Sequence, residues 1–169
     1  GKSTLINALA GGEIAEASAE RPTTTHIRVY HHRDVELGGL PSAITYGARF
    51  VAHEREELRH KVLVDTPDLD SFVREHRERT LRLLKSAGLV LWVFSPEKYL
   101  EERTWSVLRE ERRFSASAAV LNKVDGLAPG ELDAVTEDLG RRLEDAGLGK
   151  VRIFRTNALA HTADRAPGS

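Results

Sequence analysis

The chain has 169 residues, a formal net charge of −1 and no cysteine. A length of this order is typical of one domain. The near balance of 25 basic and 26 acidic residues argues against binding to nucleic acid mainly through counterion release and against a polybasic membrane anchor. The lack of cysteine excludes disulfide frameworks, thiolate metal sites and cysteine nucleophiles. No apolar run approaches the roughly 20 residues that span a bilayer, so we expect a soluble globular domain.

Helical and extended patterns alternate along the chain. Leu5, Ile6 and Leu9 have helical spacing, and the pair Gly11–Gly12 after them favours a left-handed helix end. Period-two alternation over Ile27–Tyr30 predicts a half-buried edge strand. The further elements that we expect are a weak strand at 44–51, a strand at 61–64, a helix at 71–87, a central strand at 89–94 that is apolar on both faces, a helix at 97–113, a strand at 118–121, a helix at 129–147 and a strand at 151–154.

This alternation of strands and helices predicts an α/β fold with a mostly parallel sheet and covering helices. In such sheets ligands bind beyond the carboxyl ends of the strands, where helices begin. The polar motifs at those ends are therefore the candidates for function.

The first such motif, Gly1-Lys2-Ser3-Thr4, stands at the start of the first expected helix. It matches the second half of the phosphate-loop pattern G-x-x-x-x-G-K-[ST]. In that pattern backbone amides approach phosphate, the lysine contacts the β- and γ-phosphates and the hydroxyl binds Mg²⁺. Four residues alone are a weak signal, and an ordinary helix start with a capping hydroxyl explains them equally well.

Asp65-Thr66-Pro67-Asp68 follows the strand at 61–64. A carboxylate at this place can hold Mg²⁺ through water, opposite Ser3. A threonine of the run Thr23–Thr25, which lies in a loop before a strand, can supply a further metal ligand. Because these residue types also favour turns, a plain turn or loop is the simpler explanation for each segment alone.

The most specific motif is Asn122-Lys123-Val124-Asp125, directly after a buried strand. The carboxylate of Asp125 can accept hydrogen bonds from N1–H and the exocyclic amine of guanine, which adenine lacks, and this can discriminate by about 10⁴. The aliphatic stem of Lys123 can cover the purine face, and Asn122 can tie this loop to the phosphate loop. A surface turn is the alternative, but the place of the motif after a phosphate motif and a metal motif disfavours it.

In these motifs the chain resembles a phosphate-loop GTPase of the translation-factor-related class, over nearly its whole length. The stretch Gly1–Leu9, the Arg-Pro-Thr-Thr loop at 21–24 and Asp65–Asp68 are similar to the Era-like and bacterial dynamin-like branches, and not to the Ras-like branch. The segments that match the family's five elements are Gly1–Thr4 (phosphate loop), Thr23–Thr25 (switch I), Asp65–Asp68 (switch II), Asn122–Asp125 (guanine motif) and Asn157–Ala158 (last motif). In the last motif the backbone amide of Ala158 can donate to guanine O6.

The resemblance implies a site for GTP or GDP with Mg²⁺ and, as in some relatives, K⁺. We expect Lys2 and Thr24 to be the catalytic residues. The expected metal ligands are Ser3, Thr24, Thr25 and Asp65. The expected nucleotide contacts are Gly1, Lys2, Ser3, Thr4, Asp68, Asn122, Lys123, Asp125, Asn157 and Ala158.

Three residues depart from the family pattern. Asp68 stands where switch II normally has the glycine of D-x-x-G, and a carboxylate near the γ-phosphate is repulsive unless it turns away. Leu69 stands where Ras-like enzymes have a glutamine that orients water, so hydrolysis must rely on a monovalent cation, a partner or another loop. Asn157 replaces the usual serine or threonine, which is a mild change.

We therefore expect one GTPase domain over residues 1–169 that lacks the first strand and last helix of the fold. It is expected to hydrolyse GTP slowly, as a molecular switch stimulated by a partner or a cation. The alternatives are a hydrolysis-deficient guanine-nucleotide-binding switch or scaffold, and an ATP-using phosphate-loop enzyme. Expected partners are the nucleotide, a second copy through the nucleotide face, and ribosomal RNA or a membrane through regions outside this chain. The expected location is the cytoplasm, at the membrane periphery in the dynamin-like case.

Overall fold

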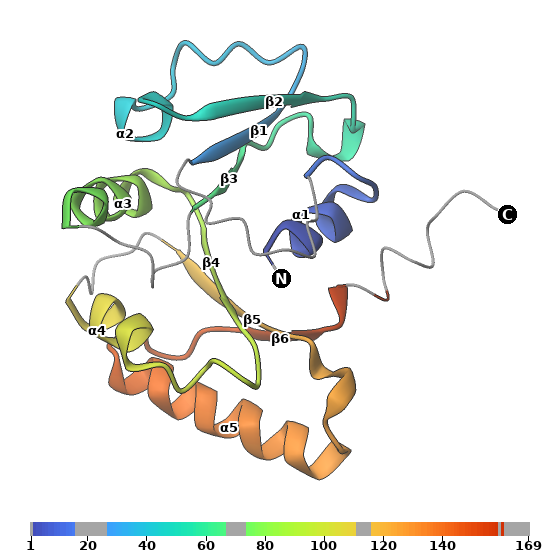
Figure 1. The fold of residues 1–169 in the computed structure, drawn as a ribbon, viewed down its shortest axis with the longest axis vertical. Helices are drawn as coiled ribbons and strands as arrows, with labels where there is room; N and C mark the ends of the chain where they lie inside the picture. Colours follow the sequence, from blue (N-terminus) through green and yellow to red (C-terminus); the bar gives the residue numbers. More distant parts are fainter. Residues whose placement is uncertain (1, 16–26, 67–73, 111–115, 159, 161–169) are drawn as a thin grey trace, which may run out of the picture. The chain divides into compact units, whose positions relative to one another are not determined.

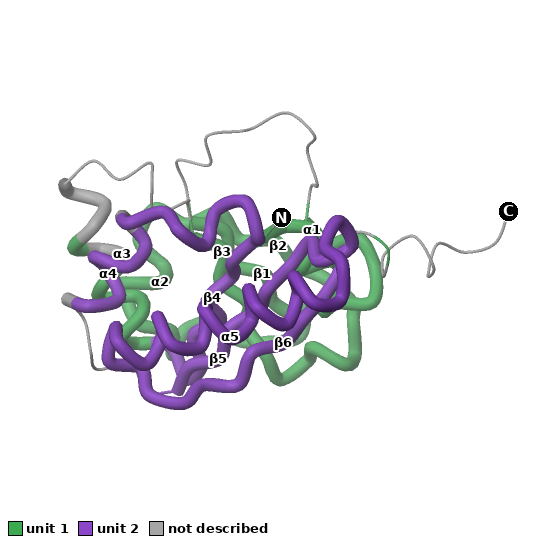
Figure 2. The backbone as a smooth tube through the Cα atoms, turned by 90° about the horizontal axis from the view of Figure 1, so that it is seen from below, with its two compact units in different colours: residues 1–86, 158–169 green, residues 87–157 purple. Residues whose placement is uncertain are grey.

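A computed structural model describes residues 2–15, 27–66, 74–110, 116–158 and 160. The chain forms two compact units, residues 1–86 with 158–169 and residues 87–157 (Figure 2). The first unit contains α1 (Lys2–Ala10), β1 (Arg28–His32), α2 (Ser42–Thr45), β2 (Arg49–His53), the short 3₁₀ helix η1 (Glu56–Leu58), β3 (Leu63–Asp65) and α3 (Arg74–Ser86). The second contains β4 (Val90–Phe94), α4 (Glu102–Glu110), β5 (Ser117–Asn122), the 3₁₀ helix η3 (Val124–Gly126), α5 (Pro129–Asp145) and β6 (Ile153–Thr156) (Figure 1). Within the described ranges, no helix is both long and apolar enough to cross a membrane.

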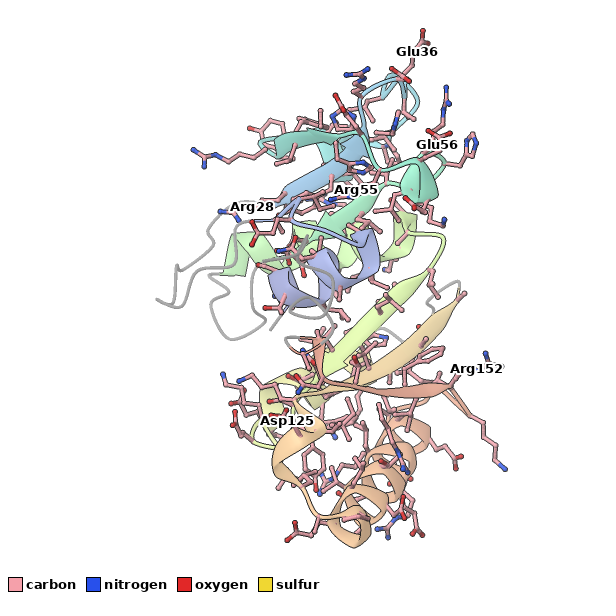
Figure 3. All side chains as sticks on the ribbon, turned by 90° about the vertical axis from the view of Figure 1, so that its right-hand side faces the viewer. Arg28, Glu36, Arg55, Glu56, Asp125 and Arg152 are labelled. Atoms are coloured by element: carbon pink, nitrogen blue, oxygen red, sulfur yellow. The ribbon has the colours of Figure 1, made fainter. Side chains whose placement is uncertain are left out.

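The sheet of the first unit has the order β2-β1-β3, with β1 parallel to β2 and antiparallel to β3. Helix α1 lies on one side of this sheet, and α2 and α3 lie on the other (Figure 1, Figure 3). Val29 of β1, Ile44 of α2 and Leu83 of α3 belong to one buried cluster, which Val64 of β3 joins. The prediction that helices cover the sheet is confirmed in this unit, where they lie on both faces.

Two histidines are buried in the same sheet, at the last residues of β1 and β2. His32 and His53 are opposite each other in the β1–β2 register, and their ring centroids are 5.9 Å apart with edge-on geometry. His32 Nδ1 accepts from the backbone amide of Asp34, and His53 Nδ1 accepts from that of Arg55. The Nε2 of His53 is buried and has no hydrogen-bond partner within the described residues. Desolvation, followed by the nearby charge of His32, lowers the pKa of His53.

The second unit has three parallel strands in the order β4-β5-β6. Helices α4 and α5 lie on the same side of these strands (Figure 1). The ring of Trp105 on α4 stacks on Phe94 of β4, with centroids 5.4 Å apart. Leu139 and Leu143 of α5 are fully buried. Three of the four strand pairings in the described residues are parallel, so the prediction of a mostly parallel sheet is confirmed.

Glycines end two helices as their positions in the sequence predict. Gly11 follows α1 with φ 65°, and Gly147 follows α5 with φ 90°. These positive angles favour glycine because a side chain would crowd the backbone. The start of α5 is fixed by Pro129 in the first turn and by Glu131, whose Oε2 accepts a hydrogen bond of 3.0 Å from the amide of Ala128.

Several expected elements differ in the structure. The weak strand predicted at 44–51 divides into α2 and β2, since the turn at Gly47 separates them with φ 58°. The helix predicted at 97–113 begins only at Glu102, because residues 95–101 form turns in which the amides of Lys98 and Tyr99 donate to the carbonyl of Ser95. The last strand begins at Ile153, two residues later than the predicted start.

Two strands occupy other positions in their sheets than their sequence patterns predicted. β1 was predicted as an edge strand, but it is the middle strand of its sheet, with Tyr30 and His32 buried. The reason is that tyrosine and histidine count as polar in an alternation pattern although most of the ring is apolar. β4 was predicted as central, yet in the described residues it pairs with β5 alone, and Leu91 remains 37% exposed.

Candidate functional site

The start of α1 lies against the end of β3 in the first unit. Lys2 Nζ donates a hydrogen bond of 2.6 Å to the carbonyl oxygen of Thr66. Asp65, the last residue of β3, is buried, and Ser3 is half-buried. The bond between Lys2 and Thr66 therefore joins the start of α1 to the end of β3, which the sequence places far apart. We call Lys2, Ser3, Thr4, Asp65 and Thr66 the phosphate-side residues.

The phosphate-side residues fit a hard cation. The Ser3 hydroxyl and the Asp65 carboxylate are the oxygen donors that Mg²⁺ prefers. Over the part of the chain that the structure describes, no group of three or more His, Cys, Asp or Glu side chains is placed to hold a metal by itself. A magnesium ion at Ser3 and Asp65 therefore needs further oxygens from phosphate and water, which is its usual mode of binding in nucleotide sites.

Asn7 fixes the chain that leaves α1. It is 2% exposed. Its Oδ1 accepts hydrogen bonds from the amides of Ile14 and Ala15, at 3.0 and 2.7 Å, and its Nδ2 donates to the carbonyl of Ala15 at 2.8 Å. This one side chain holds the backbone at the entry to residues 16–26, the segment that carries the switch I threonines in sequence.

The ends of β5 and β6 lie side by side in the second unit. Asn122 is the last residue of β5 and is opposite Thr156, the last residue of β6, in the strand register. Asn122 is buried, while Asn157 is half-buried. The parallel register thus places Asn122, the first residue of the guanine motif, opposite the residue that precedes the last motif. Ala158, which follows, is fully buried.

The two residues after Asn122 with predicted base contacts are exposed. Lys123 has φ 64°, the positive angle that is unusual for a residue with a side chain. Its Nζ lies 3.6 Å from Oε2 of Glu97, which follows β4. Asp125 lies in η3 with its side chain exposed at the surface of the second unit (Figure 3). We call Asn122, Lys123, Asp125 and Asn157 the base-side residues.

Four predicted site residues lie outside the described residues: Gly1, Thr24, Thr25 and Asp68. Leu69, whose position bears on hydrolysis, lies outside them as well. The described candidates therefore consist of the phosphate-side residues and Ala158 in the first unit and the base-side residues in the second.

The comparison with known families decides the class of the protein. The profile of a family described as "50S ribosome-binding GTPase" matches residues 1–123. The chain belongs to this GTPase family. The resemblance inferred from the motifs is therefore confirmed, and guanine-nucleotide binding with GTP hydrolysis is the general property of the family.

Individual relatives agree with this GTPase assignment. The chain is 32% identical to GTPase Der of Thiobacillus denitrificans over 85% of its own length and 28% of that protein. It is 29% identical to the isoniazid-induced protein IniC of Mycobacterium tuberculosis over 89% of its length and 34% of that protein. The GTPase chain thus spans about a third of the length of these relatives.

A solved structure shares the fold of this GTPase domain. It belongs to an oligomerised bacterial dynamin pair, described as a mechanism for the long-range sensing and tethering of membranes. It matches 99% of this chain and 33% of its own, with a TM-score of 0.73 and 17% sequence identity. At this identity the likeness establishes the G-domain fold.

The motifs did not reveal two features of the structure. Asn7 is the only strongly polar side chain in the otherwise apolar run Leu5–Ala10, and a polar residue inside an apolar helix face is a usable sign of a buried hydrogen-bonding role. The ion pair between Glu97 and Lys123 had no such sign, because it depends on the turns after β4 and on the left-handed backbone at Lys123.

Proposed function

We propose that this chain binds guanine nucleotides with Mg²⁺ and hydrolyses GTP to GDP and phosphate as a molecular switch. The observation that carries the proposal is the placement of Asn122 at the end of β5, beside the end of β6, with Lys123 and Asp125 directly after it. Membership of the GTPase family supports the same function.

On the base side, each residue has a chemical role in this proposal. The Asp125 carboxylate accepts hydrogen bonds from N1–H and the exocyclic amine of guanine. Adenine does not offer this pair of donors, so it binds less well. The stem of Lys123 covers one face of the purine while its ammonium remains in water. Asn122, which begins the motif, is buried at the end of β5.

On the phosphate side, Lys2 supplies positive charge for the β- and γ-phosphates, and α1 directs its amide groups and the positive end of its dipole at them. Ser3, Asp65 and a switch I threonine, Thr24 or Thr25, would hold Mg²⁺. When bound, Mg²⁺ neutralises charge that develops on the phosphates during transfer.

The assignment of Asp125 is tested by nucleotide competition on the full chain. GDP should displace labelled GTP in Mg²⁺ buffer, while ATP at the same concentration should not. The variant Asp125→Asn should lose GDP affinity by about 10²- to 10⁴-fold, because two hydrogen bonds to a charged group are worth about 1.5–3 kcal/mol each. The matched control is Asp133→Asn, because Asp133 is an exposed carboxylate that pairs with Arg155 at 2.8 Å. This variant should bind GDP as the wild type does. Equal displacement by ATP and GDP would instead support an ATP-using enzyme.

The second candidate is a guanine-nucleotide switch or scaffold that does not turn over. It is favoured by Asp68 in place of the switch II glycine and by Leu69 in place of a glutamine that orients water. Single-turnover hydrolysis in K⁺ and then in Na⁺ separates the two. Phosphate release in either salt supports the GTPase, and a dependence on K⁺ supports cation stimulation. GTP binding without release at high protein concentration supports the switch.

Partners and location are proposals of the same kind. The family description names the 50S ribosome, and the dynamin structure is described in terms of an oligomerised pair and membranes. We propose for this domain a cytoplasmic setting, self-association through the nucleotide face, and either a ribosomal or a membrane partner bound by regions outside this chain. Sedimentation of the full-length protein with ribosomes and with lipid vesicles, each with GDP and with a non-hydrolysable GTP analogue, distinguishes these partners.

A further inference from the structure

The ammonium of Lys123 has a specific partner outside the guanine motif. Its Nζ lies 3.6 Å from Oε2 of Glu97, in the segment between β4 and α4. Both side chains are more than half exposed, at 55% for Lys123 and 71% for Glu97. An ion pair so open to water contributes little to folding, so its interest lies in where it holds the lysine.

The segment that carries Glu97 is itself well anchored. The amides of Lys98 and Tyr99 both donate to the carbonyl of Ser95, which closes a turn around Glu97. The carbonyl of Tyr99 accepts a hydrogen bond of 2.7 Å from Nε1 of the buried Trp105. Glu97 is therefore presented from a turn whose backbone is tied to α4.

The side chain of Tyr99 anchors the same turn to α5. Burial and then the charge of Asp138 raise the pKa of the Tyr99 hydroxyl, and Arg142 lies over the Tyr99 ring at 6.0 Å from the centroid. Asp138 in turn accepts a hydrogen bond of 2.8 Å from Nε of Arg142. Two helices thus fix the turn from which Glu97 reaches Lys123.

We propose that Glu97 is a positioning residue for guanine binding, which acts by holding the ammonium of Lys123 so that the stem is preset over the purine. The inference rests on the proposed function and assigns Glu97 a part in the same site. A free lysine side chain loses rotamer freedom when it is fixed against a ligand. An ion pair at the end of the side chain restricts its rotamers before the nucleotide binds, so less rotamer freedom is lost on binding.

The size and salt dependence of the effect follow from the exposure of the pair. Exposed ion pairs have coupling energies that correspond to about a twofold to fivefold change in an equilibrium constant. Removing the charge of Glu97 should therefore weaken GDP binding by about that factor in 50 mM salt. The loss should shrink towards zero in 1 M salt, where charges are screened within about 3 Å.

The experiment is calorimetry of GDP binding to the full chain in Mg²⁺ buffer. Glu97→Gln keeps the shape of the side chain and removes its charge. Glu101→Gln is the matched control, because Glu101 lies in the same segment and pairs with Lys98 at 3.7 Å rather than with Lys123. We expect the weaker binding in Glu97→Gln and wild-type binding in Glu101→Gln.

A double-mutant cycle tests whether Glu97 acts through Lys123. Lys123→Met keeps an aliphatic stem of similar length but has no ammonium. In that background Glu97→Gln should change GDP affinity by less than about 1.5-fold, because its partner is gone. The same twofold to fivefold loss in both backgrounds would overturn the inference, and so would equal affinities of Glu97→Gln and wild type.

The outcomes also separate this inference from the proposed function. If the folded wild type binds GDP and Glu97→Gln binds it equally well, the positioning role alone is overturned. If the folded wild type binds no GDP, the proposed function falls, and the role of Glu97 falls with it.

Discussion

The ammonium of Lys2 donates a hydrogen bond to the carbonyl oxygen of Thr66, which is 64 residues further along the chain. The bond joins the first turn of α1 to the residue that follows β3, so the phosphate motif and the metal motif are linked directly. A carbonyl oxygen is a weaker acceptor for an ammonium than a charged phosphate oxygen. We therefore expect Lys2 to exchange this bond for contacts with phosphate when a nucleotide binds.

Replacement of Lys2 by methionine tests that link. Lys2→Met should weaken GTP binding by at least tenfold, because the triphosphate loses the ammonium that we propose to contact it, and should leave guanosine binding unchanged. Calorimetry with both ligands measures the difference. Lys61→Met is the matched control, since Lys61 Nζ also donates to a backbone carbonyl, that of Glu57 at 2.7 Å. An equal loss for guanosine and GTP would mean that the variant perturbs the fold rather than the phosphate contacts.

The side chain of Asn7 should make a large contribution to the free energy of unfolding. Asn7→Ala leaves the half-buried amide of Ile14 and the buried amide and carbonyl of Ala15 without their partner, which should lower the free energy of unfolding by about 2–4 kcal/mol. Urea unfolding followed by circular dichroism measures the change. Ser86→Ala, which removes an exposed hydrogen bond of 2.9 Å to the Arg82 carbonyl, should cost less than about 0.5 kcal/mol. Similar midpoints for both variants would contradict the role of Asn7.

Acid should destabilise the first unit through His53. Burial lowers the pKa of His53 below its ordinary value, so the unfolded chain binds the proton more readily than the folded one. The stability that comes from a neutral His53 is therefore complete above about pH 7 and is lost as the pH falls through 6.5 towards the lowered pKa. Urea midpoints at pH 7.5 and 5.5 measure this loss.

A variant without the imidazole identifies the group responsible. In His53→Leu the difference between the two midpoints should be smaller than in the wild type, while His60→Gln, at an exposed position, should keep the wild-type difference. An unchanged acid sensitivity in His53→Leu would assign the effect to other groups.

Trp105 should be among the most costly side chains to remove from the second unit. It is 2% exposed, stacks on Phe94 and donates to the Tyr99 carbonyl. Trp105→Ala should lower the free energy of unfolding by about 3–5 kcal/mol, because it leaves a cavity. Trp92 remains as a fluorescent reporter of unfolding. Leu100→Ala, at a side chain that is 55% exposed, should change it by less than about 1 kcal/mol.

The parts of the fold that were predicted correctly depend on local signals. The strand at Ser117–Asn122 is a short apolar run, and α5 has its apolar stripe, Pro129 near the start and Gly147 at the end. Each of these signals acts within a few residues. The order of the motifs along the chain then predicted the family, because every motif except switch I stands at the end of a strand or the start of a helix, where a nucleotide can be bound.

The errors arose where structure depends on distant partners. Whether β1 is central or at an edge is decided by β2 and β3, which the alternation at Ile27–Tyr30 cannot report. The segment after β4 has helical composition, yet its turns are held by a hydrogen bond from Trp105 of α4 and contacted by Arg142 of α5. In the candidate site the residue types were predictable, but the Lys2–Thr66 bond and the Glu97–Lys123 pair required the folded chain.

The left-handed backbone at Lys123 has a consequence for protein engineering. Glycine is the residue that relaxes such a backbone, by about 1–2 kcal/mol relative to a residue with a side chain, so a search for thermostable variants should select Lys123→Gly. That replacement would discard the stem and the ammonium together. Selection for heat resistance should therefore favour glycine at this position, whereas selection for nucleotide affinity should favour lysine.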